Sequence, residues 1–292
     1  MTDMSHTHLI SVPELRALSD AGIPHLVFDC SFDLMQPQAA REIFAQAHIP
    51  GALQADLDTH LSAHGSAEAQ SGGRHPLPSR ERLRDWLRGA GLMRGMQVVV
   101  YDRNGCNFCG RLWWLLKWAG HDAVAILDGG LQAWEQSGAP LASGAAAATG
   151  AQPGDFELAE PRVGLVGGDE MLALHDRPGQ CLIDSRAGAR YRGEVEPLDP
   201  QAGHIPGALN RPFTDNFASD GRFKPAEQLR AEFAALLDGR DPADTVVYCG
   251  SGVSAVPNLV ALELAGFSGA RLYAGSWSEW SRTPGRPVAT GT

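Results

Sequence analysis

The sequence predicts an α/β protein made of two tandem copies of one domain, each a parallel β-sheet covered by helices on both faces. The first observation behind this is that three landmarks recur in one order along the 292 residues. AHIPGAL (47–53) recurs as GHIPGAL (203–209), VVVYDRNG (98–105) as TVVYCGSG (245–252), and LDGGLQAWEQSGAPL (127–141) as LYAGSWSEWSRTPGRPV (272–288). Landmarks that repeat in the same order indicate a duplicated unit.

Apolar runs alternate with helical patterns inside each copy, which is the second observation. The strand candidates are HLVFD, VVVY and AVAILDGG in the first copy, and CLIDS, TVVY and ARLYAG in the second. Between them, SRERLRDWLRGAGL, RLWWLLKWAG and PAEQLRAEFAALL carry apolar residues at the three- and four-residue spacing of a helix. Alternating β and α segments favour a parallel sheet with helices on both faces.

Chain length and local composition set the expected domain boundaries. At ~150 residues per domain, the length favours two domains over one. The stretch at 146–156, rich in Ala, Gly and Pro, interrupts the apolar periodicity and is typical of a linker. We therefore expect an N-terminal domain over 1–145 and a C-terminal domain over 157–292. The landmark offsets give the first copy about nine additional residues, near GGRHPLP (72–78).

Charge and cysteine usage exclude several classes of partner. A net charge of -10 disfavours nucleic acid and anionic membranes, because both require a basic face. The N-terminus lacks a basic start followed by an apolar stretch, and no run approaches the roughly 18 apolar residues of a membrane span. Five cysteines in a long chain do not resemble a secreted disulfide framework. We expect a cytoplasmic protein that contacts neither nucleic acid nor a membrane.

Cys249 is the strongest candidate for a reactive group. It directly follows the strand candidate TVVY, and ligands of open α/β sheets lie beyond the carboxyl ends of the strands. The small residues of GSGVSAV leave backbone N–H groups accessible ahead of a helix that Pro257 would begin and Gly266 would end. Such a loop stabilises a thiolate, the nucleophilic form of cysteine. The alternative is a buried structural thiol, which we expect for Cys181.

The loop CGSGVSA resembles the active-site loop of the tandem-domain rhodanese superfamily, in particular the 3-mercaptopyruvate sulfurtransferases, whose loop reads CGSGVTA. Ser254 is the one position of the loop that departs from this pattern. Both HIPGAL motifs, GGRHPLP, RLWWLLKWAGH, LDGGLQAW and DSRAGARYRGEVEP extend the resemblance over nearly the whole chain. An ordered set of this kind is specific, whereas one short motif is not.

The resemblance implies a sulfurtransferase in which Cys249 takes a sulfane sulfur from a small anionic donor and carries it as a persulfide. The acceptor would be cyanide or a thiol, such as thioredoxin or a low-molecular-weight thiol. One nucleophile would serve both half-reactions, so no metal and no cofactor are expected. Asp102 stands where the second copy has Cys249, which implies that the N-terminal domain is catalytically inactive.

Arginines are the expected grip for an anionic donor, because guanidinium binds a carboxylate or sulfonate through two parallel hydrogen bonds. The resemblance implies this role for Arg190, and Arg186 is a further candidate. Arg192 is a third candidate for donor binding, and its alternative role is to pair with nearby glutamates. A second family arginine, which follows an EP pair, is replaced here by Leu198. Around the sulfur, we expect donor contacts from the loop residues Gly250, Gly252, Val253 and Ser254.

A proton relay is the remaining part of the site that the resemblance implies. Ser251 would act with His75 of GGRHPLP and with Asp58, both from the first copy. Histidine suits such a role because its pKa lies near neutrality. The alternative for His75 is an exposed loop residue without function.

The sequence offers three alternative functions and leaves open the role of one cysteine pair. A thiosulfate:cyanide sulfurtransferase would place Arg and Lys after the cysteine, where this chain has Gly250 and Ser251. A phosphatase of the same fold would need an arginine at the position of Ala255. A non-enzymatic binding module would not require the cysteine. Cys106 and Cys109, in CNFC, suit either a redox pair or two independent small core residues, and we favour the second.

Overall fold

The computed structural model describes residues 5–145 and 152–292, which form two compact units. The N-terminal unit comprises Met1–Ser62, Pro78–Arg162 and Ser219–Arg222, and the C-terminal unit comprises Ala63–Leu77, Val163–Ala218 and Phe223–Thr292. Part of the predicted linker, 146–156, lies outside the described residues, and the domain boundaries remain predictions. The segment Ala63–Leu77, which contains all of GGRHPLP except its final proline, groups with the C-terminal unit.

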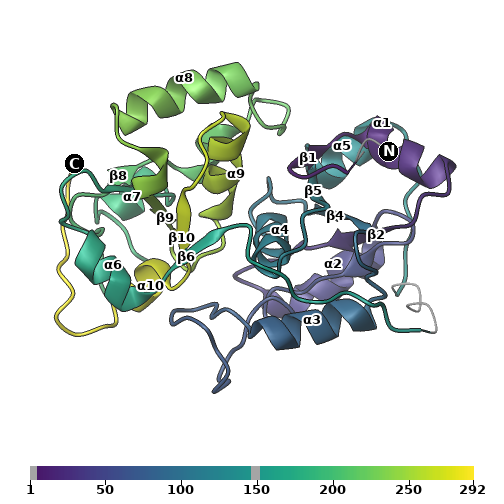
Figure 1. Cartoon of the computed structure of the whole chain (residues 1–292), viewed down its shortest axis with the longest axis horizontal. Helices are drawn as coiled ribbons and strands as arrows, with labels where there is room; N and C mark the ends of the chain where they lie inside the picture. Colours follow the sequence, from purple (N-terminus) through teal and green to yellow (C-terminus); the bar gives the residue numbers. More distant parts are fainter. Residues whose placement is uncertain (1–4, 146–151) are drawn as a thin grey trace. The chain divides into compact units, whose positions relative to one another are not determined.

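The N-terminal unit contains a five-stranded parallel sheet, as predicted (Figure 1). In spatial order its strands are β1 (Leu9–Ile10), β5 (Val124–Leu127), β4 (Gln97–Tyr101), β2 (His25–Asp29) and β3 (Leu53–Gln54). Its helices are α1 (Val12–Asp20), α2 (Ala40–Gln46), α3 (Arg80–Gly89), α4 (Cys109–Trp118) and α5 (Gly130–Gln136), with a 3₁₀ turn at Pro37–Ala39.

Successive residues of the central strands point to opposite faces of this sheet, which explains why helices cover both. Val99 and Tyr101 belong to a core cluster with α1, α2 and α5. On the other face, Phe28 contacts Trp86 of α3 with ring centroids 5.4 Å apart. Every residue of the tryptophan-rich α4 is buried, so the expectation of a packed helix is confirmed.

The C-terminal unit repeats the same sheet order with five parallel strands. In spatial order they are β6 (Gly164–Val166), β10 (Arg271–Tyr273), β9 (Thr245–Tyr248), β7 (Cys181–Asp184) and β8 (Leu209–Asn210). The helices are α6 (Gly168–Leu174), α7 (Gly188–Tyr191), α8 (Ala226–Leu237), α9 (Val256–Leu264) and α10 (Ser276–Trp280), with 3₁₀ turns at Phe213–Asn216 and Pro242–Asp244. The identical strand order confirms the duplication predicted from the three landmarks.

Helices cover both faces of this second sheet as well (Figure 1). Val246 and Tyr248 of β9 lie in a core cluster with residues of α6, α7 and α10, while α9 packs on β9 and β10 and in turn contacts α8. Pro257 stands in the first turn of α9, and Gly266 follows the helix with φ +80°. Both helix boundaries agree with the sequence-based expectation.

The HIPGAL motifs perform the same structural task in both units. The Ile49 N–H donates a 3.0 Å hydrogen bond to the Tyr101 hydroxyl, and the Ile205 N–H donates one of 3.2 Å to the Tyr248 hydroxyl. These bonds tie each motif to the last residue of β4 or β9. They thereby hold the end of the strand that Asp102 follows in one unit and Cys249 follows in the other.

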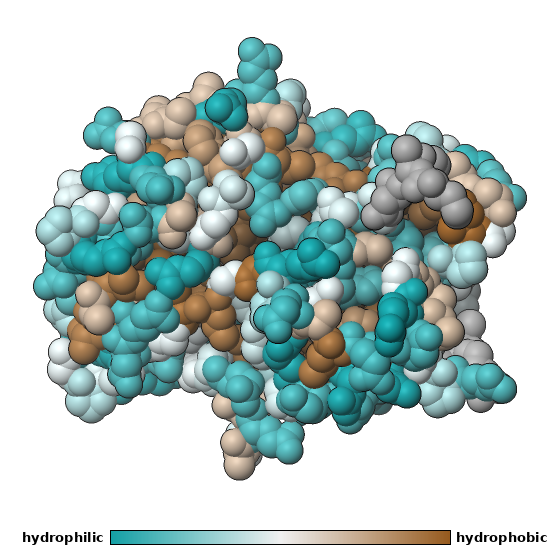
Figure 2. Space-filling model, viewed as in Figure 1, coloured by the Kyte–Doolittle hydropathy of each residue, from teal (hydrophilic) through white to brown (hydrophobic). Residues whose placement is uncertain are grey.

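The surface is mostly hydrophilic on the face shown in Figure 2, with apolar residues interspersed between polar ones. Among the described residues, no helix has the length and apolar character needed to cross a membrane.

Candidate functional site

Cys249 lies at the carboxyl end of β9, and its backbone is held on both sides. Its side chain is buried, with 1% of the residue exposed. Its N–H donates to Ser276 Oγ at 3.1 Å, and its carbonyl accepts from the Trp277 N–H at 3.0 Å. Ser276 has φ +54°, a left-handed conformation that is unusual for a residue with a side chain, and its hydroxyl donates to the Tyr273 carbonyl. The start of α10 therefore fixes the candidate nucleophile.

The loop after Cys249 requires small residues. An ideal Cβ on Gly252, which has φ +72°, would lie 2.2 Å from the Ala274 carbonyl oxygen, so only glycine fits. The Gly250 carbonyl accepts from the Ser278 N–H at 2.9 Å. Val253 is buried and Ser254 is half-buried. The loop after the cysteine thus packs against Ala274 and Ser278, and the contact of its residues with a donor remains a prediction.

The corresponding loop of the N-terminal unit shows what such a loop can hold. Asp102 replaces the cysteine, and its two carboxylate oxygens accept four backbone hydrogen bonds of 2.8 to 3.0 Å. The donors are the N–H groups of Asn104, Cys106, Phe108 and Cys109. Burial raises the pKa of Asp102, although these hydrogen bonds act in the opposite direction. The loop geometry therefore favours an anionic acceptor at its centre.

The two loops differ in the sign of φ at one position. Gly105 and Gly252 share a positive φ, but Cys106 also has φ +59°. Its counterpart Val253 is not among the residues of positive φ in the described part of the chain. The N-terminal loop therefore indicates which kind of backbone N–H groups surround Cys249, but the two loops do not have the same conformation.

His75 and Ser251 meet inside the C-terminal unit. The distance between His75 Nδ1 and Ser251 Oγ is 2.7 Å, and both residues are buried. His75 comes from the segment Ala63–Leu77, which belongs to this unit. Asp58 lies in the N-terminal unit, where its N–H donates to Asp56 Oδ1 at 3.1 Å. Its partnership with His75 stays a prediction.

Arg186 is held by the protein itself. Its Nε and Nη2 grip Asp184, with a shortest distance of 2.6 Å, and Nη2 also donates to the Gly203 carbonyl. Nη1 lies 3.3 Å from Glu196 Oε2, and the guanidinium stacks over Trp277. Burial lowers the pKa of Arg186, but the Asp184 carboxylate more than offsets this and raises it above its usual value. These contacts favour a positioning role, and donor contact by Arg186 remains a prediction.

Arg190 is placed between two carboxylates and the cysteine loop. Its Nη2 contacts Glu196 Oε1 at 2.6 Å and Asp199 Oδ2 at 3.4 Å. Its Nη1 lies 3.5 Å from the position of an ideal Cβ on Gly250. Arg192, by contrast, pairs with Glu194 near the surface.

Sequence reasoning missed three residues of this region. Arg74 places Nη2 3.2 Å from the same Cβ position on Gly250. Asp199, whose side chain is fully buried, pairs with Arg74 at 2.8 Å, and Ser276 binds the Cys249 N–H. A basic residue next to His75 was a visible signal for Arg74. No local pattern marks Asp199 or Ser276, because their partners are distant in sequence.

The other four cysteines are buried and reduced. Burial raises the pKa of all four: Cys30, Cys106, Cys109 and Cys181. Cys106 and Cys109 lie in the same buried loop, and each influences the pKa of the other. Both cysteines are buried core residues, as expected, and whether they form a redox pair stays open.

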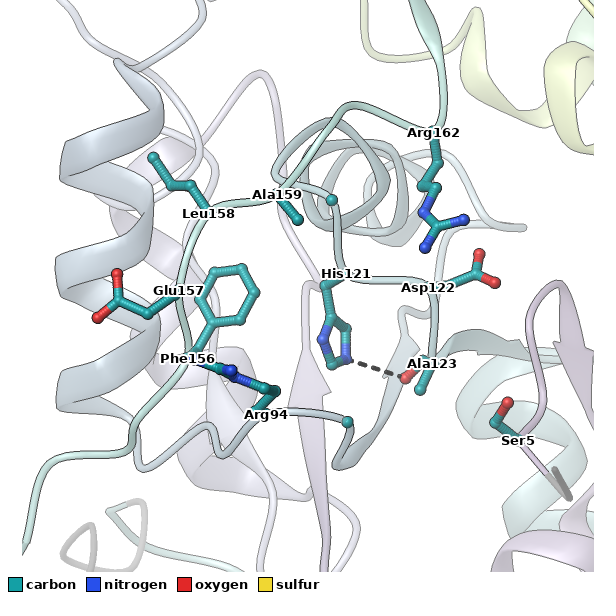
Figure 3. A pocket seen from close by; sticks show the side chains of 12 residues that line it. Ser5, Arg94, His121, Asp122, Ala123, Phe156, Glu157, Leu158, Ala159 and Arg162 are labelled. Atoms are coloured by element: carbon teal, nitrogen blue, oxygen red, sulfur yellow. Dashed lines mark hydrogen bonds between the residues drawn. The ribbon is translucent and has the colours of Figure 1, made fainter. Parts of the chain in front are cut away.

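A cavity of about 480 Å³ in the N-terminal unit contains none of the residues expected at the site (Figure 3). Arg94, His121, Asp122 and Arg162 are among its lining residues. The His121 ring bonds to the Ala123 carbonyl, and burial lowers the pKa of His121. The charged side chains along this cavity have both signs, so the cavity has no clear preference for an anion.

Two α/β units, each built on a parallel sheet, define a tandem protein of the rhodanese fold. The second unit has a cysteine at the carboxyl end of its central strand. The Rhodanese-like domain matches residues 11–137 and 168–283. The chain belongs to the rhodanese-like domain family.

Full-length relatives carry sulfurtransferase names. A Pseudomonas aeruginosa protein, provisionally named 3-mercaptopyruvate sulfurtransferase, is 48% identical over 99% of this chain and 100% of its own length. A Mycobacterium tuberculosis protein, provisionally named thiosulfate sulfurtransferase SseB, is 39% identical over 97% of both chains. The crystal structure of SseA from Escherichia coli, titled as a 3-mercaptopyruvate sulfotransferase, aligns with a TM-score of 0.77 at 30% identity. The alignment covers 94% of this chain and 100% of the SseA chain.

Proposed function

We propose that the protein transfers a sulfane sulfur from 3-mercaptopyruvate, through a persulfide on Cys249, to a thiol or cyanide acceptor. The names of the relatives support a sulfurtransferase. The observation that carries the proposal is the placement of Cys249 beside a loop over which the Arg190 guanidinium lies, 3.5 Å from the Cβ position of Gly250. A thiol next to a carboxylate-binding cation suits a donor that carries both sulfur and a carboxylate.

In the first half-reaction the Cys249 thiolate attacks the donor sulfur. A sulfur–sulfur bond forms and the carbon–sulfur bond of the donor breaks. The bonding electron pair passes to carbon as the enolate of pyruvate, which then takes up a proton. Cys249 is left as a persulfide, and no external oxidant or reductant is needed.

The hydrogen-bonded pair of His75 and Ser251 supports a proton relay for this step. With 2.7 Å between Nδ1 and Oγ, the hydroxyl can pass a proton toward the donor while the imidazole replaces it. Asp58 would orient the imidazole in this account. Four N–H groups around the buried Asp102 in the other unit support the idea that this type of loop holds an anionic group, here the persulfide.

In the second half-reaction the acceptor attacks the outer sulfur of the persulfide and regenerates the Cys249 thiolate. Cyanide would leave as thiocyanate, and a thiol would leave as its own persulfide. We propose thioredoxin or a low-molecular-weight thiol as the natural acceptor, in the cytoplasm.

Thiosulfate is the alternative donor. The name of the Mycobacterium tuberculosis relative favours it. Against it, the positions after the cysteine are Gly250 and Ser251, neither of which carries charge. The two arginines near Gly250 fit a carboxylate or a sulfonate, so a lower activity with thiosulfate is compatible with the same site.

The test is a steady-state assay of sulfur transfer to cyanide from each donor, with wild type and Cys249→Ser side by side. We expect faster turnover with 3-mercaptopyruvate and none in the variant. A preference for thiosulfate would change the proposed donor but leave the proposed sulfurtransferase activity in place. No transfer from either donor would overturn the enzymatic proposal and favour a binding module.

A further inference from the structure

We propose that the N-terminal unit binds a free amino acid with an apolar side chain, in a cavity of about 340 Å³ beside the loop that follows β4. This inference goes beyond the proposed function and does not depend on sulfur transfer. A cavity of this size accommodates a small molecule. The lining residues that carry the argument are Phe32, Asp33, Leu34, Ile43, Arg103 and Phe108.

The cavity lies at the carboxyl edge of the first sheet. One part of its lining follows β2 and another follows β4, and these two strands are neighbours in the sheet. Ligands of open α/β sheets bind at this edge. In the C-terminal unit the corresponding neighbours are β7 and β9, and Cys249 directly follows β9. The cavity therefore takes the place in the first copy that the candidate active site takes in the second.

The loop that forms one wall of the cavity is held by the protein itself. The N–H groups of Asn104 and Phe108 each donate to the Asp102 carboxylate at 2.8 Å. The Arg103 carbonyl accepts from Gln132 Nε2 at 2.9 Å. A wall that is fixed at three points needs little ordering when a ligand enters, which favours the binding of a small molecule.

Arg103 provides a cation with one uncommitted nitrogen. Its Nε donates to Ser31 Oγ at 3.3 Å, and its Nη2 contacts Asp29 Oδ2 at 3.4 Å and the Ala47 carbonyl. Nη1 has no hydrogen-bond partner among the residues that the structure describes. The side chain is 22% exposed. A guanidinium tethered in this way can donate from Nη1 to the carboxylate of a ligand.

Asp33 provides the opposite charge. Its Oδ1 accepts the N–H groups of Met35 at 2.8 Å and Gln36 at 3.2 Å, which fixes the carboxylate. Within the described part of the chain, Oδ2 has no hydrogen-bond partner and no ion pair joins Asp33 to Arg103. Oδ2 can therefore accept a hydrogen bond from an ammonium group.

The balance of charge distinguishes an amino acid from a simple anion. The Arg103 guanidinium already pairs with the buried Asp29, and Asp33 adds a second carboxylate, so at least one negative charge remains. A ligand with only a carboxylate would be repelled. An amino acid brings an ammonium group for Asp33 and a carboxylate for Arg103, and it adds no net charge.

The rest of the lining selects the side chain of the amino acid. Phe32 and Phe108 are almost completely buried, and their rings meet edge to face with centroids 5.5 Å apart. Leu34 and Ile43 are half-buried. An apolar side chain gains from contact with these residues, whereas a charged one would lose water without a partner.

The test is calorimetric titration of the whole protein with L-phenylalanine. Two truncated probes are titrated beside it: 2-phenylethylamine, which has no carboxylate, and 3-phenylpropionate, which has no ammonium group. We expect both to bind at least about tenfold more weakly than L-phenylalanine. Equal binding of 3-phenylpropionate, or no heat from L-phenylalanine at millimolar concentration, would overturn the inference.

Asp33→Asn tests the acidic residue, because the amide keeps an oxygen for the two backbone N–H groups but removes the charge. It should weaken the binding of L-phenylalanine about tenfold. Asp241→Asn is the matched control, since Asp241 also accepts a backbone N–H two residues ahead, from Ala243, but lies in the C-terminal unit. It should bind as wild type does. An unchanged affinity in Asp33→Asn would contradict the proposal.

Hydrogen exchange then locates the bound amino acid without any substitution. L-Phenylalanine should slow exchange in peptides that cover 31–36 and 103–108, and leave 249–255 unchanged. Protection confined to 249–255 would overturn the inference, because it would place the amino acid at the candidate sulfurtransferase site instead.

Discussion

His75 Nδ1 lies 2.7 Å from Ser251 Oγ, although 176 positions separate the two residues in the sequence. The contact brings an imidazole to the residue two positions after Cys249. It forms because the segment Ala63–Leu77 packs within the C-terminal unit, in spite of its place in the first sequence copy. The contact on which the proposed relay rests therefore depends on tertiary packing, not on local sequence.

The first prediction concerns this relay. His75→Gln should lower kcat with 3-mercaptopyruvate by roughly 100-fold and leave KM nearly unchanged, since proton transfer is lost but the donor contacts remain. His175→Gln, at the end of α6, is the control and should keep wild-type rates. Stopped-flow measurement of pyruvate release gives both parameters. A His75→Gln variant with wild-type kcat over the whole pH range would show that the contact is only structural.

The second prediction concerns the cysteine loop. Gly252→Ala should reduce turnover at least about tenfold and lower the melting temperature, because the new Cβ would meet the Ala274 carbonyl oxygen at 2.2 Å. Gly239→Ala has a similar positive φ with no atom within 4 Å of its Cβ. It should pay only the torsional cost and retain activity. Equal activities in the two variants would argue against a tightly fitted loop.

The third prediction concerns the loop of the N-terminal unit. Asp102→Ala removes the acceptor of four backbone hydrogen bonds inside a buried loop. The free energy of unfolding should fall by about 2–4 kcal/mol, measured by urea denaturation. Asp33→Ala, which loses two such bonds at a half-buried position, should cost clearly less. A loss at Asp102 no larger than at Asp33 would contradict the anion-holding loop.

The fourth prediction is a pH dependence at Glu232. Partial burial raises the pKa of Glu232, but hydrogen bonds from Arg211, Lys224 and Gln228 more than offset this and lower it to about 2. Because the folded-state pKa lies below the ordinary value of 4.5, this carboxylate stabilises the fold above that value. Its contribution is lost as the pH falls from about 4.5 to about 2.

Glu232→Gln should therefore lower the free energy of unfolding on the order of 1 kcal/mol near neutral pH, with the difference from wild type vanishing toward pH ~2. Urea titrations at several pH values measure it. The exposed Glu160→Gln serves as the control. A difference that stays constant down to the acid limit would show that the effect does not arise from ionisation of Glu232.

The sequence predicted the duplicated fold because its signals are local. The central strands β4 and β9 are short apolar runs, and the turn chemistry of Pro257 and Gly266 bounds α9. The two-residue strands β3 and β8 are too short to show alternation, and the edge strands β1 and β6 are equally weak as patterns. These elements exist because neighbouring strands supply their hydrogen bonds, which no local pattern records.

The candidate site was predictable where a motif carries it and not where packing builds it. Cys249 and its glycine loop stand together in the sequence, and the resemblance supplied His75. Arg186 was expected beside the donor, but its own neighbour Asp184 holds it. Arg74 was overlooked because its approach to Gly250 follows from the fit of Gly73 against α10, a contact between segments about 200 positions apart.

The most direct test of the account is whether sulfur resides on Cys249 between the half-reactions. Wild-type protein treated with 3-mercaptopyruvate in the absence of an acceptor, alkylated and digested, should show one added sulfur atom on the peptide that contains Cys249. Pyruvate should appear in equal amount, and cyanide should remove the added sulfur as thiocyanate. Pyruvate release without sulfur on this peptide, or sulfur carried by Cys106 or Cys109 instead, would contradict the central claim.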